Sequence, residues 1–340
     1  MGGSKLDKID FVITWVDDSD PEWLKEKEKY AKQNNSTKDF KAVTAENVYR
    51  DWEILRFWFR AVERYAPWVN KIFFVTYGHL PSWLNTDHEK IVVVNHTDFL
   101  PADALPTFNS RAIETSFHKI KGLSEQFVYF NDDFFLNDDV NKEDFFVEGV
   151  PKDSAILSPI VPNRYTTANI QVNDVEIIND YFSKKEVLKK DFRKWFTFLY
   201  GKKILRSILF SPFGTFVGFY EPHIPNSYLK STFEKVWELE KTTLTMTTYS
   251  KFRNKTNVNQ WLFRYWQLAS GNFIPRNIQF GKFYQLTKDN TELLDDIENS
   301  KHKVICINDT FEGIDYNKTK NDLIAAFQKK FPQKSAFEVR

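Results

Sequence analysis

Short apolar runs separated by longer amphipathic segments set the pattern of this chain. Runs dominated by apolar and aromatic residues predict buried strands at residues 9–16 (IDFVITWV), 71–76 (KIFFVT), 91–94 and 127–130. Between the first two runs, apolar positions recur at helical spacing over residues 47–65. This β–α–β alternation predicts an α/β fold, with a Rossmann-like, mostly parallel sheet and helices on both of its faces.

The rest of the pattern is organised around residues 127–136 (FVYFNDDFFL). The buried run leads into Asn131, Asp132 and Asp133, at the carboxyl end of a strand, where open α/β sheets bind their ligands. Adjacent carboxylates repel each other, and a divalent cation removes that cost and in turn favours a diphosphate. One interpretation is therefore a site for a metal ion and a nucleotide sugar. The other is a strand that ends in an Asx turn with two solvated acids.

Acidic residues also follow the first predicted strand. The run at residues 9–16 leads into Asp17, Asp18, Ser19 and Asp20, and an acidic turn after the first strand is a natural place for a nucleotide to dock. Ser19 or Asp20 is equally well explained as the N-cap of a helix that begins at residue 21 or 22.

The other predicted elements divide the chain into three parts. We expect helices at residues 22–33, 111–123 (capped by Ser110), 169–190, 233–240, 257–268 and 322–331, and a last strand at residues 303–307. The alternation of apolar runs and amphipathic segments becomes less regular after residue 140. We therefore expect an α/β core that binds the nucleotide sugar over residues 5–150, a mostly helical insertion over residues 151–250, and the remainder of the core with a C-terminal helix over residues 251–340.

Residues 193–220 interleave Lys and Arg with Trp, Phe, Tyr and Leu. Two interpretations stay open for this segment. It rests on a membrane surface or holds a lipid-linked acceptor, or it is a helical segment packed on the core.

Composition narrows the class of protein. The net charge is +1 among 340 residues, so no overall field points to nucleic acid. Cys306 is the one cysteine, which excludes an internal disulfide and a cysteine-based zinc site. No stretch has the ~18 uninterrupted apolar residues of a membrane helix, and residues 1–8 lack the apolar run of a secretory signal. We expect a cytoplasmic protein, either free or peripheral at the inner face of the cell membrane.

Four separated pieces resemble the stealth family of sugar-phosphate transferases. Residues 9–23 (IDFVITWVDDSDPEW) are similar to its first region, and residues 51–136 to its second, through WEILRFWFRAVERYAPWVNKIFFVTYG, LPTFNSRAIE and FVYFNDD. Residues 222–239 with 251–266 are similar to the third, and ICIND at residues 305–309 to the fourth. One departure is Asp18, which stands where the family usually has a glycine in the first loop.

The resemblance implies a fold and an activity. Members have a glycosyltransferase-A-like core and transfer a sugar 1-phosphate from a nucleotide sugar to a sugar hydroxyl. For a UDP-sugar donor, the product is a phosphodiester in a surface polysaccharide and the leaving group is UMP. The expected partners are the donor and an oligosaccharide or lipid-linked glycan acceptor, and the expected cofactor is Mg²⁺ or Mn²⁺.

The same resemblance suggests roles for particular residues. We expect His223, Asp133 and Arg253 to be catalytic, because an imidazole suits general base work near neutral pH and a guanidinium binds a diphosphate. The expected metal ligands are Asp132, Asp133, Asn308 and Asp309; the expected substrate ligands are Trp15, Asp17, Asp20, Asn109, Ser110 and Asn131. Without the resemblance, each has a simpler interpretation: an inert loop histidine, a surface arginine, and a turn at residues 308–309.

Two features serve as contrasts. The other histidines are interpreted as structural; they are His79, His88, His96, His118 and His302. A second Asn-Asp-Asp at residues 137–139 follows no comparable buried run, so we interpret it as a loop.

Two rival functions stay open. A metal-dependent glycosyltransferase also holds a nucleotide sugar with acids at a strand end, but it releases UDP. A carbohydrate-binding protein without catalytic activity would use the many aromatic residues and need no metal.

Overall fold

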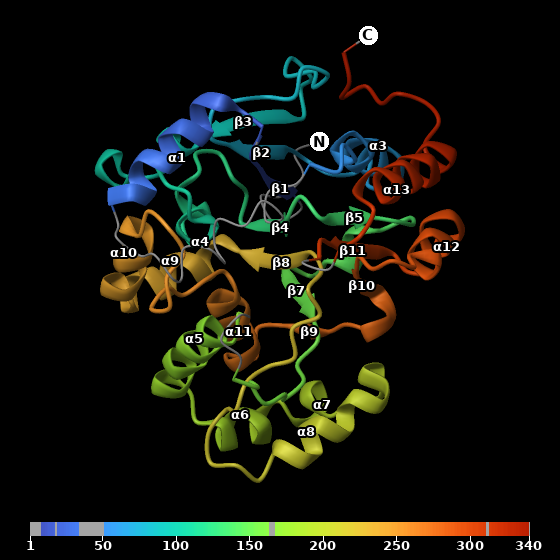
Figure 1. Cartoon of the computed structure of the whole chain (residues 1–340). Helices are drawn as coiled ribbons and strands as arrows, with labels where there is room; N and C mark the ends of the chain where they lie inside the picture. Colours follow the sequence, from blue (N-terminus) through green and yellow to red (C-terminus); the bar gives the residue numbers. More distant parts are fainter. Residues whose placement is uncertain (1–7, 18, 34–50, 163–166, 311–312, 340) are drawn as a thin grey trace, which may run out of the picture.

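A five-stranded sheet forms the centre of the computed structural model, which describes residues 8–17, 19–33, 51–162, 167–310 and 313–339 (Figure 1). Its strands are β3 (Ile91–Asn95), β2 (Ile72–Thr76), β1 (Ile9–Trp15), β4 (Gln126–Phe130) and β8 (Asn226–Leu229), in that order. The first four are parallel, and β8 pairs antiparallel with β4 at the edge. The predicted mostly parallel α/β sheet is therefore confirmed.

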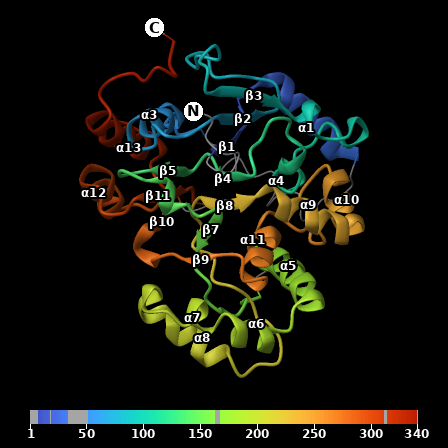
Figure 2. The ribbon, with the colours of Figure 1, turned by 180° about the vertical axis from the view of Figure 1, so that it is seen from behind.

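Helices cover both faces of this sheet, because successive side chains of a strand point to opposite faces. Phe11 and Ile13 of β1 pack into one core with α3 (Leu55–Tyr65) and α13 (Tyr316–Lys330). Val12 faces the other core, with α9 (Lys230–Leu239) and α11 (Trp261–Ala269). Figures 1 and 2 show the two helix pairs on different sides of β1.

A second sheet continues from the first at the Asn-Asp-Asp sequence. It consists of β10 (Gly281–Gln285), β11 (Val304–Asn308) and β5 (Phe134–Leu136), with β5 antiparallel to β11. Because β5 begins directly after residues 131–133, this turn is the point where the chain leaves one sheet and enters the other.

Helices also form much of the segment between β7 (Val150–Asp153) and β8. These helices are α5 (Ala168–Tyr181), α6 (Lys184–Lys190), α7 (Phe192–Trp195) and α8 (Ile204–Phe210), with a 3-10 segment, η7 (Phe198–Lys203), before α8. Helix α5 packs against α11, so contacts join residues 151–250 to the C-terminal part, and the three-part division stays a prediction. Apart from α4, the remaining α-helices and strands are α1 (Pro21–Gln33), β6 (Phe146–Val147), β7 (Val150–Asp153), α10 (Lys241–Tyr249), β9 (Ile274–Pro275) and α12 (Thr291–Asn299).

Three predicted helices differ from the structure. The one expected over residues 47–65 is α3, which begins only at Leu55, and the described residues 51–54 are not helical. The helix expected at residues 111–123 ends early, as α4 (Ser110–Glu114) followed by a 3-10 turn, and its cap is Asn109 rather than Ser110. The hydroxyl of Thr115 donates to the carbonyl of Arg111 at 2.8 Å, a local bond that competes with helix continuation.

The helix expected at residues 169–190 is interrupted at Phe182. This residue takes an extended conformation and packs its ring on Trp266 at 4.9 Å between centroids. Of the described helices, none has the length and apolar content needed to cross a membrane. Asp18 and residues 34–50 lie outside the described residues.

Candidate active site

Asp133 lies at the junction of the two sheets. The backbone N–H of Phe134 donates to the carbonyl of Asn131 at 3.1 Å, which closes the turn, and the N–H of Ile307 donates to the carbonyl of Asp133 at 2.9 Å. Strand β11 therefore fixes the end of β4. The predicted strand end with paired acids is present, and Asn131 and Asp132 lie beside Asp133 in the same turn.

The two oxygens of the Asp133 carboxylate have different surroundings. Oδ2 accepts a hydrogen bond from the Cys306 thiol at 3.3 Å, whereas Oδ1 is buried and has no hydrogen-bond partner among the described residues. Burial, together with repulsion from Asp132, raises the pKa of Asp133 to about 7. A buried acceptor with nothing bound to it is costly, so Oδ1 is suited to a cation or a substrate proton.

His223 lies beside this carboxylate. Its Nε2 is 3.9 Å from Oδ2 of Asp133, and its ring packs edge-on against Phe134 and Phe283, with centroids 5.1 and 5.5 Å away. Burial lowers the pKa of His223 to about 4. The imidazole is therefore neutral at pH 7 and able to accept a proton.

A buried ionic network holds the loop that carries His223. His223 has a positive φ of 51°, and its backbone N–H donates to Oε1 of Glu221 at 3.0 Å. Arg264 of α11 contacts Glu221 at 3.1 Å and Asp153 at 2.7 Å, and also donates to the carbonyl of Tyr220 at 3.0 Å. The strained histidine backbone is thus anchored to the core through Glu221.

This network leads to a prediction about stability. Arg264→Met should lower the free energy of unfolding by about 3–5 kcal/mol, because Asp153 and Glu221 would be left buried without a counter-charge. Urea unfolding measures the difference. As a control, Lys235→Met breaks an ion pair with Glu238 whose side chains are 53% and 70% exposed, and it should cost less than about 0.5 kcal/mol. Equal losses in the two variants would contradict an anchoring role for Arg264.

Arg253 approaches the site from the loop before α11. It donates to the Ser110 hydroxyl at 2.8 Å, and Ser110 in turn hydrogen-bonds the buried carboxyl of Glu114. The charge of Arg253 also favours the ionised form of Asp132, whose pKa is nevertheless raised to about 6, first by burial and then by Asp51. Although nearby protein atoms displace enough water to raise this pKa, the side chain of Asp132 reaches the surface more than that of Asp133, so water screens the charge of Asp132 more strongly. The predicted residues Ser110, Asp132 and Arg253 therefore interact.

Asn109 is fully buried, and its side chain bonds within the protein. Its amide donates to the Ser250 carbonyl and to Oδ1 of Asn257, each at 3.0 Å, and its oxygen accepts from the N–H of Arg111. These bonds tie α4 to residues 250–257, the loop that contains Arg253. They give Asn109 a positioning role, and direct contact with a substrate stays a prediction.

The first acidic loop is organised by His79. The N–H of Asp17 donates to Nε2 of His79 at 2.7 Å, so the proton of the neutral ring lies on Nδ1, which faces Oδ2 of Asp20 at 3.3 Å. Oδ1 of Asp20 accepts from the N–H groups of Glu22 and Trp23. The N-cap interpretation of Asp20 is thus confirmed. Contacts of Trp15, Asp17 and Asp20 with a nucleotide stay predictions.

Asn308 is the last residue of β11, and Asp309 follows it. The N–H of Ile307 donates to the carbonyl of Asp133 at 2.9 Å, so Asn308 is the next residue of β11 beyond the contact of this strand with the turn. The Asn308 amide donates to Oε1 of Gln285 at 2.8 Å, and Oδ1 of Asp309 accepts from the N–H of Thr310 at 2.6 Å. Asp132 and Asp133 therefore share one turn, and Asn308 follows the β11 residue that contacts this turn; the binding of one metal ion by the four predicted ligands stays a prediction.

A metal ion fits this turn best through oxygen ligands. Among the described residues, one group of three potential ligands has its His, Cys and Asp ligand atoms within 4.8 Å of one another; it consists of Asp133, His223 and Cys306. Burial and the neighbouring Asp133 raise the pKa of the Cys306 thiol well above its usual value, so the sulfur is a protonated donor rather than a thiolate ligand. This leaves Oδ1 of Asp133, with its neighbouring acids, for a hard cation.

Two contributors were missed at the level of sequence. As a single cysteine, Cys306 indicates only the absence of a disulfide and of a cysteine-based zinc site, although it precedes Asn308 by two residues and so shares its face of the strand. Asp51 was not singled out; burial raises its pKa, and it interacts electrostatically with Asp17 and Asp132. Asp51 therefore links the acids that follow β1 and β4, and no pattern in the sequence indicates this.

The second Asn-Asp-Asp lies at the opposite end of β5. Asn137 is fully buried and donates to the carbonyl oxygens of Asp296 and His302. It accepts from Lys330. These contacts are structural, in agreement with the loop interpretation.

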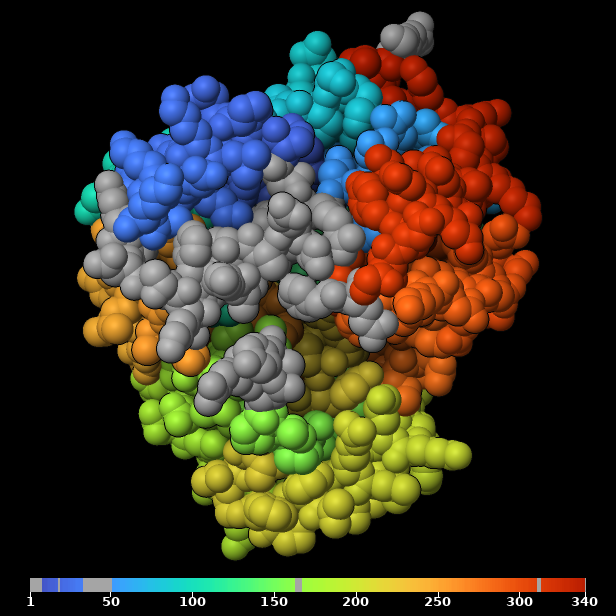
Figure 3. Space-filling view, viewed as in Figure 1, coloured from blue at the N-terminus to red at the C-terminus, as the bar shows by residue number. Residues whose placement is uncertain are grey.

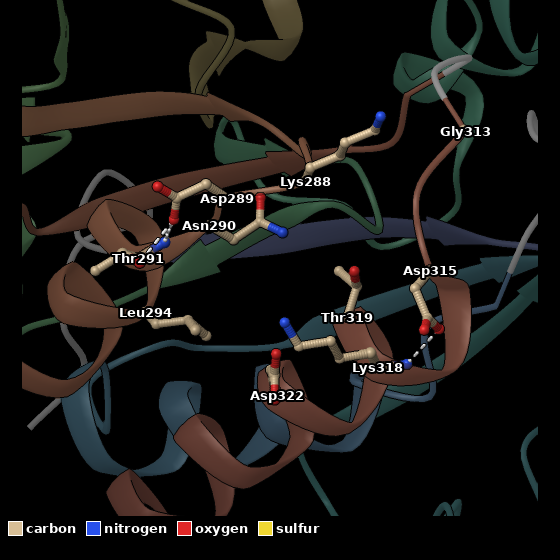
Figure 4. A pocket seen from close by; sticks show the side chains of 10 residues that line it. All are labelled: Lys288, Asp289, Asn290, Thr291, Leu294, Gly313, Asp315, Lys318, Thr319 and Asp322. Carbon is tan, nitrogen blue, oxygen red and sulfur yellow. Dashed lines mark hydrogen bonds between the residues drawn. The ribbon is translucent and has the colours of Figure 1, made fainter.

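A pocket of about 370 Å³ lies between the start of α12 and the start of α13 (Figure 4). Asp289 and Asp315, which line it, accept hydrogen bonds from the backbone at those two helix starts. None of the predicted site residues lines this pocket.

Comparison with protein families gives matches to two adjacent regions. Residues 7–35 match the family model described as Stealth protein CR1, conserved region 1, and residues 48–153 match Stealth protein CR2, conserved region 2. Both agree with the resemblance seen at residues 9–23 and 51–136.

Curated relatives are similar over nearly the whole chain. The capsular polysaccharide phosphotransferase WcwK of Streptococcus pneumoniae is 49% identical over 334 residues, with 98% of each chain covered. The receptor polysaccharide phosphotransferase WefC of Streptococcus oralis is 43% identical, with 98% of this chain and 100% of that protein covered. The exopolysaccharide phosphotransferase cps2G of Lactiplantibacillus plantarum is 42% identical, with 97% and 96% covered.

Solved structures are similar only distantly. The galactosyltransferase LgtC with donor and acceptor sugar analogs has 9% identity and a TM-score of 0.40, with 96% of this chain and 98% of that chain covered. The WbbM bifunctional glycosyltransferase has 10% identity and a TM-score of 0.37, with 97% and 52% covered. The fold class rests on the sheet described above.

Proposed function

Because this chain belongs to the Stealth family, we propose that it transfers a hexose 1-phosphate or N-acetylhexosamine 1-phosphate from a nucleotide sugar to a sugar hydroxyl. It is an enzyme, a phosphotransferase, and its relatives carry out phosphotransfer in the synthesis of capsular and extracellular polysaccharides. The observation that carries the proposal is the neutral His223 imidazole 3.9 Å from Asp133, whose other oxygen has no partner among the described residues.

The proposed reaction is an in-line displacement at phosphorus. The acceptor oxygen bonds to the phosphorus that bears the sugar, the bond from this phosphorus to the bridging oxygen breaks, and UMP leaves when the donor is a UDP-sugar. His223 accepts the hydroxyl proton at Nε2, with Asp133 as the alternative base. Arg253, held by Ser110, offers its guanidinium to the diphosphate.

The proposed cofactor is Mg²⁺ or Mn²⁺, held by Asp132, Asp133, Asn308 and Asp309. When bound, it supplies positive charge to the phosphoryl oxygens. The uncompensated Asp133 oxygen and the repulsion among Asp17, Asp51 and Asp132 support a cation at this site.

The remaining details of the proposal concern partners. The donor is a UDP-sugar, bound beside the first loop by Trp15, Asp17 and Asp20, with Asn131 and Ser110 near its diphosphate. The acceptor is an oligosaccharide or a lipid-linked glycan, and the enzyme works in the cytoplasm, where nucleotide sugars are available.

The nucleotide that is released tests this function. Incubation with a panel of UDP-sugars, acceptor and Mg²⁺ should yield UMP and a phosphodiester signal in phosphorus NMR, because attack takes place at phosphorus. Release of UDP with a plain glycoside would instead identify a metal-dependent glycosyltransferase. Sugar binding without release of any nucleotide would identify a carbohydrate-binding protein.

A further inference from the structure

Helices α7 and α8 lie at one end of the molecule (Figures 1 and 3), and apolar side chains of residues 192–213 are exposed there. Phe198 is 96% exposed, and Leu205 and Leu209 are 64% and 66% exposed. Monomeric soluble proteins rarely gather apolar side chains of this size on one surface without a partner. We define the outer apolar face as Phe192, Phe198, Leu199, Leu205, Ile208, Leu209 and Phe213, all of them exposed.

Helix α8 turns its apolar face toward solvent, whereas a surface helix normally packs its apolar face on the core. Leu205, Ile208 and Leu209 have the i, i+3, i+4 spacing of one helix face, and that face is the exposed one. Ser207 points inward: it is fully buried, and its hydroxyl accepts from the N–H of Leu157 at 3.0 Å. The apolar face is therefore turned outward in the folded protein.

Specific internal contacts hold the outer apolar face in place. Trp195 and Tyr200 are fully buried. The Tyr200 hydroxyl donates to the carbonyl of Lys194 at 2.7 Å and accepts from the N–H of Ala155 at 3.1 Å. The core interpretation of residues 193–220 holds for these buried aromatics and is wrong for the outer apolar face.

The segment that forms this face carries charge of one sign, and the acidic residue that borders it, Asp191, pairs with Lys194 at 3.5 Å. Residues 192–213 contain five basic residues and no Asp or Glu, as the sequence shows; the five are Arg193, Lys194, Lys202, Lys203 and Arg206. Lys203 lies over the ring of Tyr220 at 4.1 Å and Lys194 donates to the Gly271 carbonyl at 2.6 Å, whereas Arg193 and Lys202 are exposed. A second copy docked on the same face would bring like charges together, so the charge favours an anionic partner.

We propose that the outer apolar face and its basic residues bind the surface of a membrane that contains anionic lipids. Apolar side chains would enter the boundary between headgroups and acyl chains, and the cations would contact the headgroups. The binding itself does not depend on the proposed reaction. The use of this binding in catalysis does depend on it, because residues 211–222 connect α8 to His223, and the backbone pairing of Phe219 with Leu157 fixes this connection. Docking would hold the site beside a lipid-linked acceptor.

Co-sedimentation of the full chain with vesicles tests the proposal. Vesicles of phosphatidylcholine with about one-third phosphatidylglycerol should bind the protein, and pure phosphatidylcholine should bind it much more weakly. Arg193→Glu with Lys202→Glu should lower the partition coefficient at least about 25-fold, since each cation near an anionic surface contributes roughly fivefold. Phe198→Ser with Leu205→Ser and Leu209→Ser should lower it at least about tenfold.

Matched controls separate this face from the rest of the surface. Leu239→Ser with Met246→Ser removes exposed apolar residues of α9 and α10, and Lys25→Glu with Lys241→Glu reverses two exposed charges elsewhere. Both controls should bind like the wild type. Should the triple variant unfold, Phe198→Ser alone serves, because a side chain that is 96% exposed contributes almost nothing to the core.

Three results would overturn the proposal. One is a wild type that does not bind anionic vesicles, and another is binding that the variants and controls lower equally. The third is a wild-type dimer in sedimentation analysis that the triple variant converts to a monomer, which would make this face a protein interface. None of these measurements uses a donor or turnover, so failure here is separate from failure of the proposed reaction.

Discussion

Asp133→Asn is expected to remove metal-dependent turnover, with a loss of at least about 10³-fold. The substitution deletes the charge of a carboxylate whose Oδ1 has no partner in the described part of the chain. Because an amide oxygen still accepts the hydrogen bond from Cys306, the turn should keep its structure. The measurement is the rate of UMP release as a function of Mg²⁺ concentration, together with thermal unfolding.

The repeated tripeptide provides the control for this experiment. Asp138 lies at the other end of β5, where its Oδ1 accepts from the N–H of Asp139 at 2.8 Å. Asp138→Asn preserves that bond and should leave turnover close to the wild-type rate. Equal losses in the two variants would mean that the metal and substrate lie elsewhere.

His223→Asn is expected to slow transfer by about 10²–10⁴-fold, the usual contribution of a general base. Asparagine is the better replacement because it tolerates the positive φ of 51° at this position, whereas alanine would add backbone strain. Donor affinity should change little, since the proposed base contacts the acceptor proton. Donor affinity and saturated turnover are measured for each variant.

Arg253→Ala is the comparison for the histidine. The guanidinium is proposed to contact the diphosphate before and during reaction, so its loss should weaken donor binding and turnover together. If His223→Asn bound donor poorly but turned over normally at saturation, His223 would be a donor ligand, and Asp133 would become the leading candidate for the base.

The sequence predicts the central sheet well because parallel strands are buried on both faces. Strands β2 and β4 are buried at every position, so their apolar runs stand out. Strand β8 was missed because it reads Asn-Ser-Tyr-Leu. Its polar residues are tolerated in the core partly because Gln267 of α11 donates to the Ser227 carbonyl and accepts from the Leu229 N–H. Because these hydrogen bonds come from a residue far away in the sequence, the sequence of β8 alone does not indicate a buried strand.

The sequence and the family resemblance indicate which residues belong to the candidate site, but they do not indicate how these residues lie relative to one another. The strand end at Asp133 follows from the buried run, and the family resemblance adds His223 and Arg253. That His223 faces Asp133 depends on the burial of Arg264 under its loop, and the sequence does not indicate that Arg264 is buried. Asn109 illustrates the same limit, because its type and motif suggested a ligand whereas its contacts hold the neighbouring loop.

The pairing of β5 with β11 has a consequence for the chain as it leaves the ribosome. The four parallel strands of the central sheet are complete once Phe130 has emerged. The hydrogen-bond partner of Asp133, Cys306, is 173 residues later in the chain. At typical rates of synthesis, the ribosome needs about 10–35 seconds to add these residues. Until then, β5 lacks the strand it pairs with, so the proposed site is incomplete and the nascent chain exposes an edge on which other chains can aggregate.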